Sequence, residues 1–178
     1  GAATVVGPVL GSVLLWTVCR QPGQLSWEVA ADDDFVAVVA SGSAEPAEGS
    51  STVAVEVDGL TPGTTYWYRF TSSGATSPVG RTRTLPAGRP ERLRIGFTTC
   101  ARYGQSRFHV YRALATADLD LVVHLGDYIY EDTKADVPGR EPEPDHDCVT
   151  LEDYRARHLQ SRRDPDLQLL HQRHPMVV

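Results

Sequence analysis

The sequence predicts two regions of different fold class, a β-sandwich over residues 1–86 and part of an α/β domain over residues 91–178. Short segments rich in Val, Thr and aromatic residues recur through the first region with turn-forming residues between them, which is typical of a sandwich. The period of the apolar residues then changes, and all 6 histidines lie beyond that change. Between the two regions, Pro86 and Pro90 disfavour helix and strand pairing alike, so we place a linker there.

Composition excludes several classes of protein. Hydrophobic residues make up 41% and charged residues 22% of the 178 residues, close to the average for folded domains. The apolar run over residues 9–18 is interrupted and too short to span a membrane. With 17 Lys and Arg against 23 Asp and Glu, no basic surface for nucleic acid is expected. Cys19, Cys100 and Cys148 are too few for a disulfide framework and lack the paired spacing of a zinc site.

The predicted strands of the first region cover residues 12–20, 25–31, 35–41, 51–57, 65–72 and 79–84. In residues 53–70, apolar side chains alternate on both sides of a Pro62-Gly63 turn. Tyr66, Tyr68 and Phe70 form the second alternating set, and we expect them to be core residues. This stretch resembles the corner between strands E and F of a fibronectin type III module, where a Tyr hydroxyl caps upstream backbone.

The second region begins with a predicted βαβ unit. It consists of a strand over residues 93–99, a helix over 106–116 and a second strand over 119–125. Such units form parallel strands, and ligands collect at the carboxyl ends of those strands. The helix is expected to turn four apolar side chains inward, those of Phe108, Tyr111, Leu114 and Ala115. The polar residues 131–149 that follow predict a long surface loop.

Two further helices and a strand are expected near the end of the chain. Thr150 followed by Asp153 predicts a capped helix start, and Asp164 followed by Pro165 predicts another. The first helix is expected to pack through Leu151, Tyr154, His158 and Leu159, and the second through Leu167, Leu169 and Leu170. Residues 176–178 look like the beginning of a third buried strand.

Reactive side chains follow both strands of the βαβ unit. Cys100 follows the first, Gly126-Asp127 follows the second, and Tyr130 can return toward the same point. A carboxylate can bridge two metal ions, and a phenol or thiolate is a good ligand for a strongly acidic cation, which favours ferric iron over magnesium. We therefore predict a metal site formed by Cys100, Asp127 and Tyr130. Taken singly, each has an ordinary alternative as a buried thiol, a turn residue or a packing residue, and His124 as a core histidine.

Several segments resemble PhoD-type alkaline phosphatases. Residues 93–100 and 120–131, including Gly126-Asp127 and Tyr130, look like the start of that family's metallophosphatase domain. Residues 150–157 and 164–168 are similar to its helical stretch before the next metal motif, and the β region resembles its amino-terminal sandwich. The G-D-x-x-Y core is also similar to that of purple acid phosphatases, but these normally have a carboxylate at the position of Cys100.

The resemblance implies an enzyme of the metallophosphoesterase superfamily that hydrolyses phosphomonoesters or phosphodiesters outside the cytoplasm, either secreted or periplasmic and cell-wall associated. No leader is visible in the sequence. Carried over by residue, Cys100 and Tyr130 would bind Fe³⁺, and Asp127 would bridge Fe³⁺ and Ca²⁺. The family's later ligand motifs have no counterpart here, so we expect an amino-terminal fragment that is inactive alone.

A different class of function remains open beside this one. The chain could be a non-enzymatic extracellular β-sandwich binding module with a structural βαβ remnant, and such a module would purify without iron. The sequence leaves open the substrate preference, the catalytic residues, the oligomeric state and the roles of Cys19 and Cys148.

Overall fold

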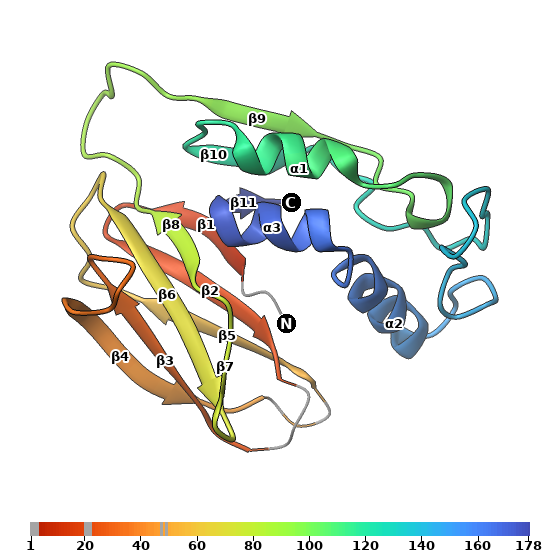
Figure 1. Ribbon diagram of the computed structural model, residues 1–178, viewed down its shortest axis with the longest axis horizontal. Coiled ribbons are helices and arrows are strands. Elements are labelled where there is room, and N and C mark those ends of the chain that lie inside the picture. The colour runs from red at the N-terminus through yellow and green to blue at the C-terminus, as the bar shows by residue number, and fades with distance from the viewer. Residues whose placement is uncertain (1–3, 20–22, 47, 49) are drawn as a thin grey trace.

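The computed structural model describes residues 4–19, 23–46, 48 and 50–178, and these form mostly β-sheet with few helices (Figure 1). One sheet has six strands in the order β5-β2-β1-β11-β10-β9, and the other has the order β4-β3-β6-β7 with β8 also paired to β6. The strands are β1 Thr4–Val9, β2 Ser12–Val18, β3 Leu25–Ala30, β4 Val38–Ala44, β5 Thr52–Val57, β6 Thr65–Ser72, β7 Ala75–Thr76, β8 Gly80–Arg83, β9 Ile95–Thr98, β10 Leu121–His124 and β11 Met176–Val177. The α-helices are α1 His109–Thr116, α2 Leu151–Ser161 and α3 Pro165–Arg173, with a short 3-10 helix at Tyr103–Gln105. Among the described residues, no helix combines the length and apolar character that crossing a bilayer demands.

In the first half of the chain, β2 and β5 face β3 and β6 across one apolar core. Alternate residues of these strands, such as Leu15, Val29 and Tyr68, are fully buried. The Tyr66 hydroxyl accepts a hydrogen bond from the Thr61 N–H at 2.9 Å, so the expected backbone cap at this corner is present. Most expected strands are confirmed, although Arg20, the last residue of one, lies outside the described residues.

The strand expected over residues 35–41 starts later, at Val38. The Asp32 carboxylate accepts hydrogen bonds from the N–H groups of Val36 and Ala37 at 2.8 and 2.7 Å. This side chain therefore holds the preceding residues in a turn and delays the strand.

Strand β1, which the sequence did not predict, joins the two halves of the molecule. It pairs antiparallel with β2 and parallel with β11, where Val6 lies opposite Met176. The two halves also touch through side chains, since the Tyr68 hydroxyl donates to the His171 carbonyl at 3.4 Å. The six-stranded sheet thus runs without a break from the β half into the α/β half.

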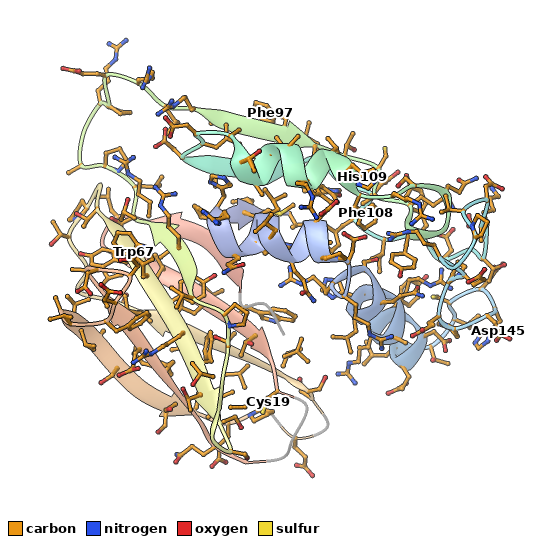
Figure 2. All side chains as sticks on the ribbon, viewed as in Figure 1. Cys19, Trp67, Phe97, Phe108, His109 and Asp145 are labelled. Carbon is orange, nitrogen blue, oxygen red and sulfur yellow. The ribbon has the colours of Figure 1, made fainter. Side chains whose placement is uncertain are left out.

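In the second half, β9, β10 and β11 are parallel, as expected for a βαβ unit. Helices α1 and α3 cover the face that carries Val122 and Met176, both fully buried. The predicted inward residues Phe108, Tyr111 and Ala115 are buried in the same cluster, and Leu114 packs against it. The apolar residues of the opposite face are partly or largely exposed to solvent, and Phe97 is 61% exposed. These residues are Ile95, Phe97, Leu121, Val123 and Val177. Figure 2 shows Phe97 on the side of β9 turned away from α1.

Both predicted helix starts are confirmed. Thr150 and Asp153 form a reciprocal capping box at α2, and the Asp164 carboxylate caps α3 with Pro165 at its first position. The predicted packing face of α2 is correct only in part. His158 packs against Trp16 and Tyr128, but the buried residues of this helix are Arg157, Gln160 and Ser161. Leu151 and Tyr154 are instead exposed on the wall of a groove of about 790 Å³, beside residues 50–52.

Candidate metal centre

The carboxyl ends of β9 and β10 bring the predicted site together. The Cys100 N–H donates to the Gly126 carbonyl at 3.2 Å, and the Ala101 N–H donates to the Asp127 carbonyl at 2.8 Å. Cys100 and Asp127 have φ angles of 59° and 54°, a left-handed conformation that is uncommon for residues other than glycine. Gly126, with φ at 114°, supplies the sharp turn that precedes Asp127. Two unusual backbone conformations therefore face each other across adjacent strand ends, as is frequent at functional sites.

Two donor side chains, those of Tyr130 and Cys100, converge on one carboxylate oxygen of Asp127. The Tyr130 hydroxyl donates to Asp127 Oδ2 at 2.8 Å, and Cys100 Sγ lies 3.8 Å from the same oxygen. Thr99 Oγ1 is 3.3 Å from Cys100 Sγ. Asp127 and Cys100 are exposed to solvent, while Tyr130 is half-buried. The structure thus places the three sequence-predicted residues together, and their role as metal ligands stays a prediction.

The neighbouring groups set the electrostatics of Tyr130. Its hydrogen bond to the Asp127 carboxylate, followed by its interaction with Cys100, raises the pKa of the phenol above its ordinary value of 10. The Arg102 guanidinium stacks on the ring, with 3.6 Å between Cζ and the ring centroid, and forms an ion pair with Asp132. That pairing lowers the pKa of Asp132. Arg102 gives no signal in the sequence, because only the fold brings its guanidinium against Tyr130, a residue 28 positions away.

His124 lies behind the site as a core residue. It is 3% exposed, and its Nε2 is 3.3 Å from the Tyr111 hydroxyl. Its ring packs edge-on against Tyr128, with 5.1 Å between the centroids. Burial lowers the pKa of His124, so the ring is neutral at pH 7. His124 is therefore a buried core histidine, and its ring is paired with the Tyr111 hydroxyl.

The donor set fits a metal ion of high charge, but only in part. Within the described residues, no three His, Cys, Asp or Glu side chains gather as a possible metal cluster. Cys100 and Asp127 supply two such donors, and the Tyr130 phenol adds a third of a kind that strongly acidic cations accept. Three donors are fewer than two metal ions require.

Comparisons with known proteins agree with one another. Residues 95–178 match the family described as PhoD-like phosphatase, and residues 7–86 match the PhoD-like phosphatase N-terminal domain. The chain is 37% identical to alkaline phosphatase D of Bacillus subtilis (strain 168), over 96% of this chain and 32% of that protein. A solved structure of PhoD aligns with a TM-score of 0.90 and 34% identity, over 99% of this chain and 38% of the other.

The chain therefore belongs to the PhoD-like phosphatase family. It spans about a third of the length of the two relatives that it matches, 32% of one and 38% of the other.

Proposed function

We propose that this chain is the amino-terminal part of a metal-dependent alkaline phosphatase that hydrolyses phosphomonoesters or phosphodiesters outside the cytoplasm. It would comprise a fibronectin type III-like sandwich and the first part of a metallophosphoesterase domain. The observation that carries this proposal is the meeting of a thiol, a phenol and a carboxylate at Asp127 Oδ2, on a solvent-exposed sheet edge. Ligands of parallel α/β sheets collect at such edges.

Cys100 and Tyr130 would hold Fe³⁺, and Asp127 would hold Fe³⁺ and Ca²⁺ together. Metal ions bound there would neutralise the charge of a phosphoester and make water more acidic. The two oxygens of Asp127 allow one carboxylate to serve two cations. The hydrogen bond to Asp127 keeps the proton on the Tyr130 hydroxyl, so ligation requires the cation to displace that proton. The exposure of Cys100 and Asp127 leaves the site open to a substrate.

Two observations support our proposal that further chain completes the domain. Three donors do not make a dinuclear centre, and the sheet face carrying Phe97 and Leu121 retains exposed apolar surface. Parallel strands are almost always covered on both faces. We therefore expect the 178-residue chain to show no phosphatase turnover by itself.

A chimera provides the positive test. The chain would replace the matching third of B. subtilis alkaline phosphatase D, to which it is 37% identical. We expect the chimera to hydrolyse a chromogenic phosphomonoester in the presence of iron and calcium, and to lose that activity with Asp127→Asn. Asp127→Asn removes a charged donor and keeps the side-chain volume. A folded chimera that lacks activity, or one that is indifferent to Asp127→Asn, would contradict the proposed site.

The isolated chain distinguishes the two classes of function. A ferric centre with a phenolate or thiolate ligand absorbs visible light, so addition of Fe³⁺ should produce a coloured protein. Tyr130→Phe should shift or bleach that absorption. A binding module would instead take up no iron. Clear turnover by the isolated chain that survives Cys100→Ala would show that the site is misplaced.

A further inference from the structure

Arg157 of α2 is almost fully buried, at 3% exposed. A guanidinium carries five N–H groups in a fixed planar arrangement, and here they serve five backbone carbonyls. The acceptors and distances are Glu143 for Nε at 3.0 Å, Tyr130 and Asp132 for Nη1 at 2.7 and 2.6 Å, and Pro144 and His146 for Nη2 at 2.9 and 3.3 Å.

Backbone carbonyls, and no carboxylate, surround the Arg157 guanidinium among the described residues. Burial of a charged group is costly unless its hydrogen-bonding groups are satisfied. None of the ion pairs among the described residues includes Arg157, so the carbonyl dipoles provide its compensation. The same side chain fixes two separate segments, residues 130–132 and residues 143–146, against α2. Arg157 therefore ties an early and a late part of the long polar loop to the same helix.

Two of the contacts that hold Tyr130 in place lead back to the Arg157 guanidinium. Arg157 holds the Tyr130 carbonyl directly. It also holds the carbonyl of Asp132, whose carboxylate pairs with the Arg102 guanidinium that stacks on the Tyr130 ring. The Tyr130 hydroxyl, in turn, reaches Asp127 Oδ2 at 2.8 Å.

We propose that Arg157 is a positioning residue of the candidate metal centre, which fixes the Tyr130 phenol against Asp127 by holding the backbone at residues 130 and 132. A role of Arg157 in iron binding rests on the proposed function above. The positioning itself is a property of the metal-free chain and can be measured there.

The test uses the chain with ¹³C-labelled tyrosine, followed by NMR without metal. Tyr130→Phe identifies the Tyr130 ring signal by its disappearance. In Arg157→Gln we expect this signal to shift or broaden, while the signal of Tyr66, which lies in the β half, stays in place. Amide hydrogen exchange in residues 131–148 should accelerate by about tenfold or more, because several charge-assisted hydrogen bonds are lost.

Arg155 offers a matched control on the same helix. Its side chain is 49% exposed and, among the residues that the structure describes, forms an ion pair only with the surface residue Glu152, at 3.7 Å. Arg155→Gln removes the same charge and should leave the Tyr130 signal and the loop exchange unchanged. Equal effects of Arg155→Gln and Arg157→Gln would overturn the proposal, because they would indicate a general effect of helix charge.

Arg157→Lys covers the case in which Arg157→Gln does not fold. An ammonium has three N–H groups, so it keeps the charge but cannot serve five carbonyls. We expect a folded protein with an altered Tyr130 signal. A Tyr130 signal at the wild-type position in either folded variant would overturn the positioning role.

Ferric iron then separates this proposal from the proposed function. We expect the visible absorption of the iron-loaded wild type to shift or weaken in Arg157→Lys and to be unchanged in Arg155→Gln. If the wild type binds no iron but its Tyr130 signal still depends on Arg157, the metal function is wrong and the positioning role stands. If iron absorption is lost in Tyr130→Phe but is the same in Arg157→Lys as in the wild type, the positioning role is wrong.

Discussion

Acid should destabilise this protein well above the pH at which its carboxylates titrate, because several histidines are buried in the neutral form. The His158 ring lies against Tyr128 and Trp16, with 5.4 and 6.2 Å between ring centroids. Burial, together with the positive charge of Arg162, lowers the pKa of His158 from 6.5 to about 4. His171 is 1% exposed, and burial followed by Arg162 lowers its pKa well below 6.5.

The sign of the effect follows from proton binding. Below pH 6.5 the unfolded chain binds a proton at His158 that the folded protein does not bind, so stability falls as the pH falls toward about 4. Between about pH 7 and about pH 4.5, this one residue should lower the free energy of unfolding by about 2 kcal/mol. His171 adds to the loss, because its Nε2 accepts a hydrogen bond from Arg162 Nη1 at 2.6 Å and lies 2.9 Å from the Tyr128 hydroxyl. Protonation would remove that acceptor.

Urea unfolding followed by tryptophan fluorescence across this range measures the loss. Asp153, whose pKa is lowered from 3.8 to about 2 by backbone hydrogen bonds, contributes only below this window. His158→Gln should reduce the pH dependence by about 2 kcal/mol. A stability that stays flat over the window, or a pH dependence unchanged by His158→Gln, would refute the argument.

Three further predictions concern the β half. Tyr66→Phe removes the acceptor for the Thr61 N–H and should cost about 1 kcal/mol of stability in urea unfolding; no loss would mean that water replaces the hydroxyl. In Gly80→Ala the new Cβ would lie 2.2 Å from Cζ of the fully buried Tyr68, and the strain should cost about 3 kcal/mol in thermal or urea unfolding. A wild-type melting temperature for Gly80→Ala would contradict this packing. Residues 1–86 expressed alone keep β2 but lack β11, the parallel partner of β1, so β1 amides should exchange faster than β2 amides. Equal protection would show that β1 does not need β11.

Local signals in the sequence predicted most elements and the position of the candidate site. The starts of α2 and α3 could be predicted because Thr150 and Asp164 act on backbone within the next few residues. The meeting of Cys100, Asp127 and Tyr130 could be predicted because parallel strands end at a common edge.

The features that sequence reasoning missed depend on partners far along the chain. The role of Arg157 has no local signal in the sequence, because only the fold of residues 130–146 surrounds its guanidinium with carbonyls. For the same reason the sequence predicts that Leu151 and Tyr154 pack against the core, whereas the structure exposes both. Strand β1 was missed because its pairing with β11 has no local signature.

The continuous six-stranded sheet also constrains the order of events during synthesis. Val6 and Met176 are 170 positions apart, so β1 emerges from the ribosome long before its parallel partner exists. At typical bacterial and eukaryotic elongation rates the delay is roughly ten to thirty seconds. Throughout that time one edge of β1 has no strand beside it, and unpaired strand edges are where nascent chains associate with each other. Once β11 is synthesised, it covers this free edge of β1. Translation products that stop short of β11 should therefore depend most on chaperones.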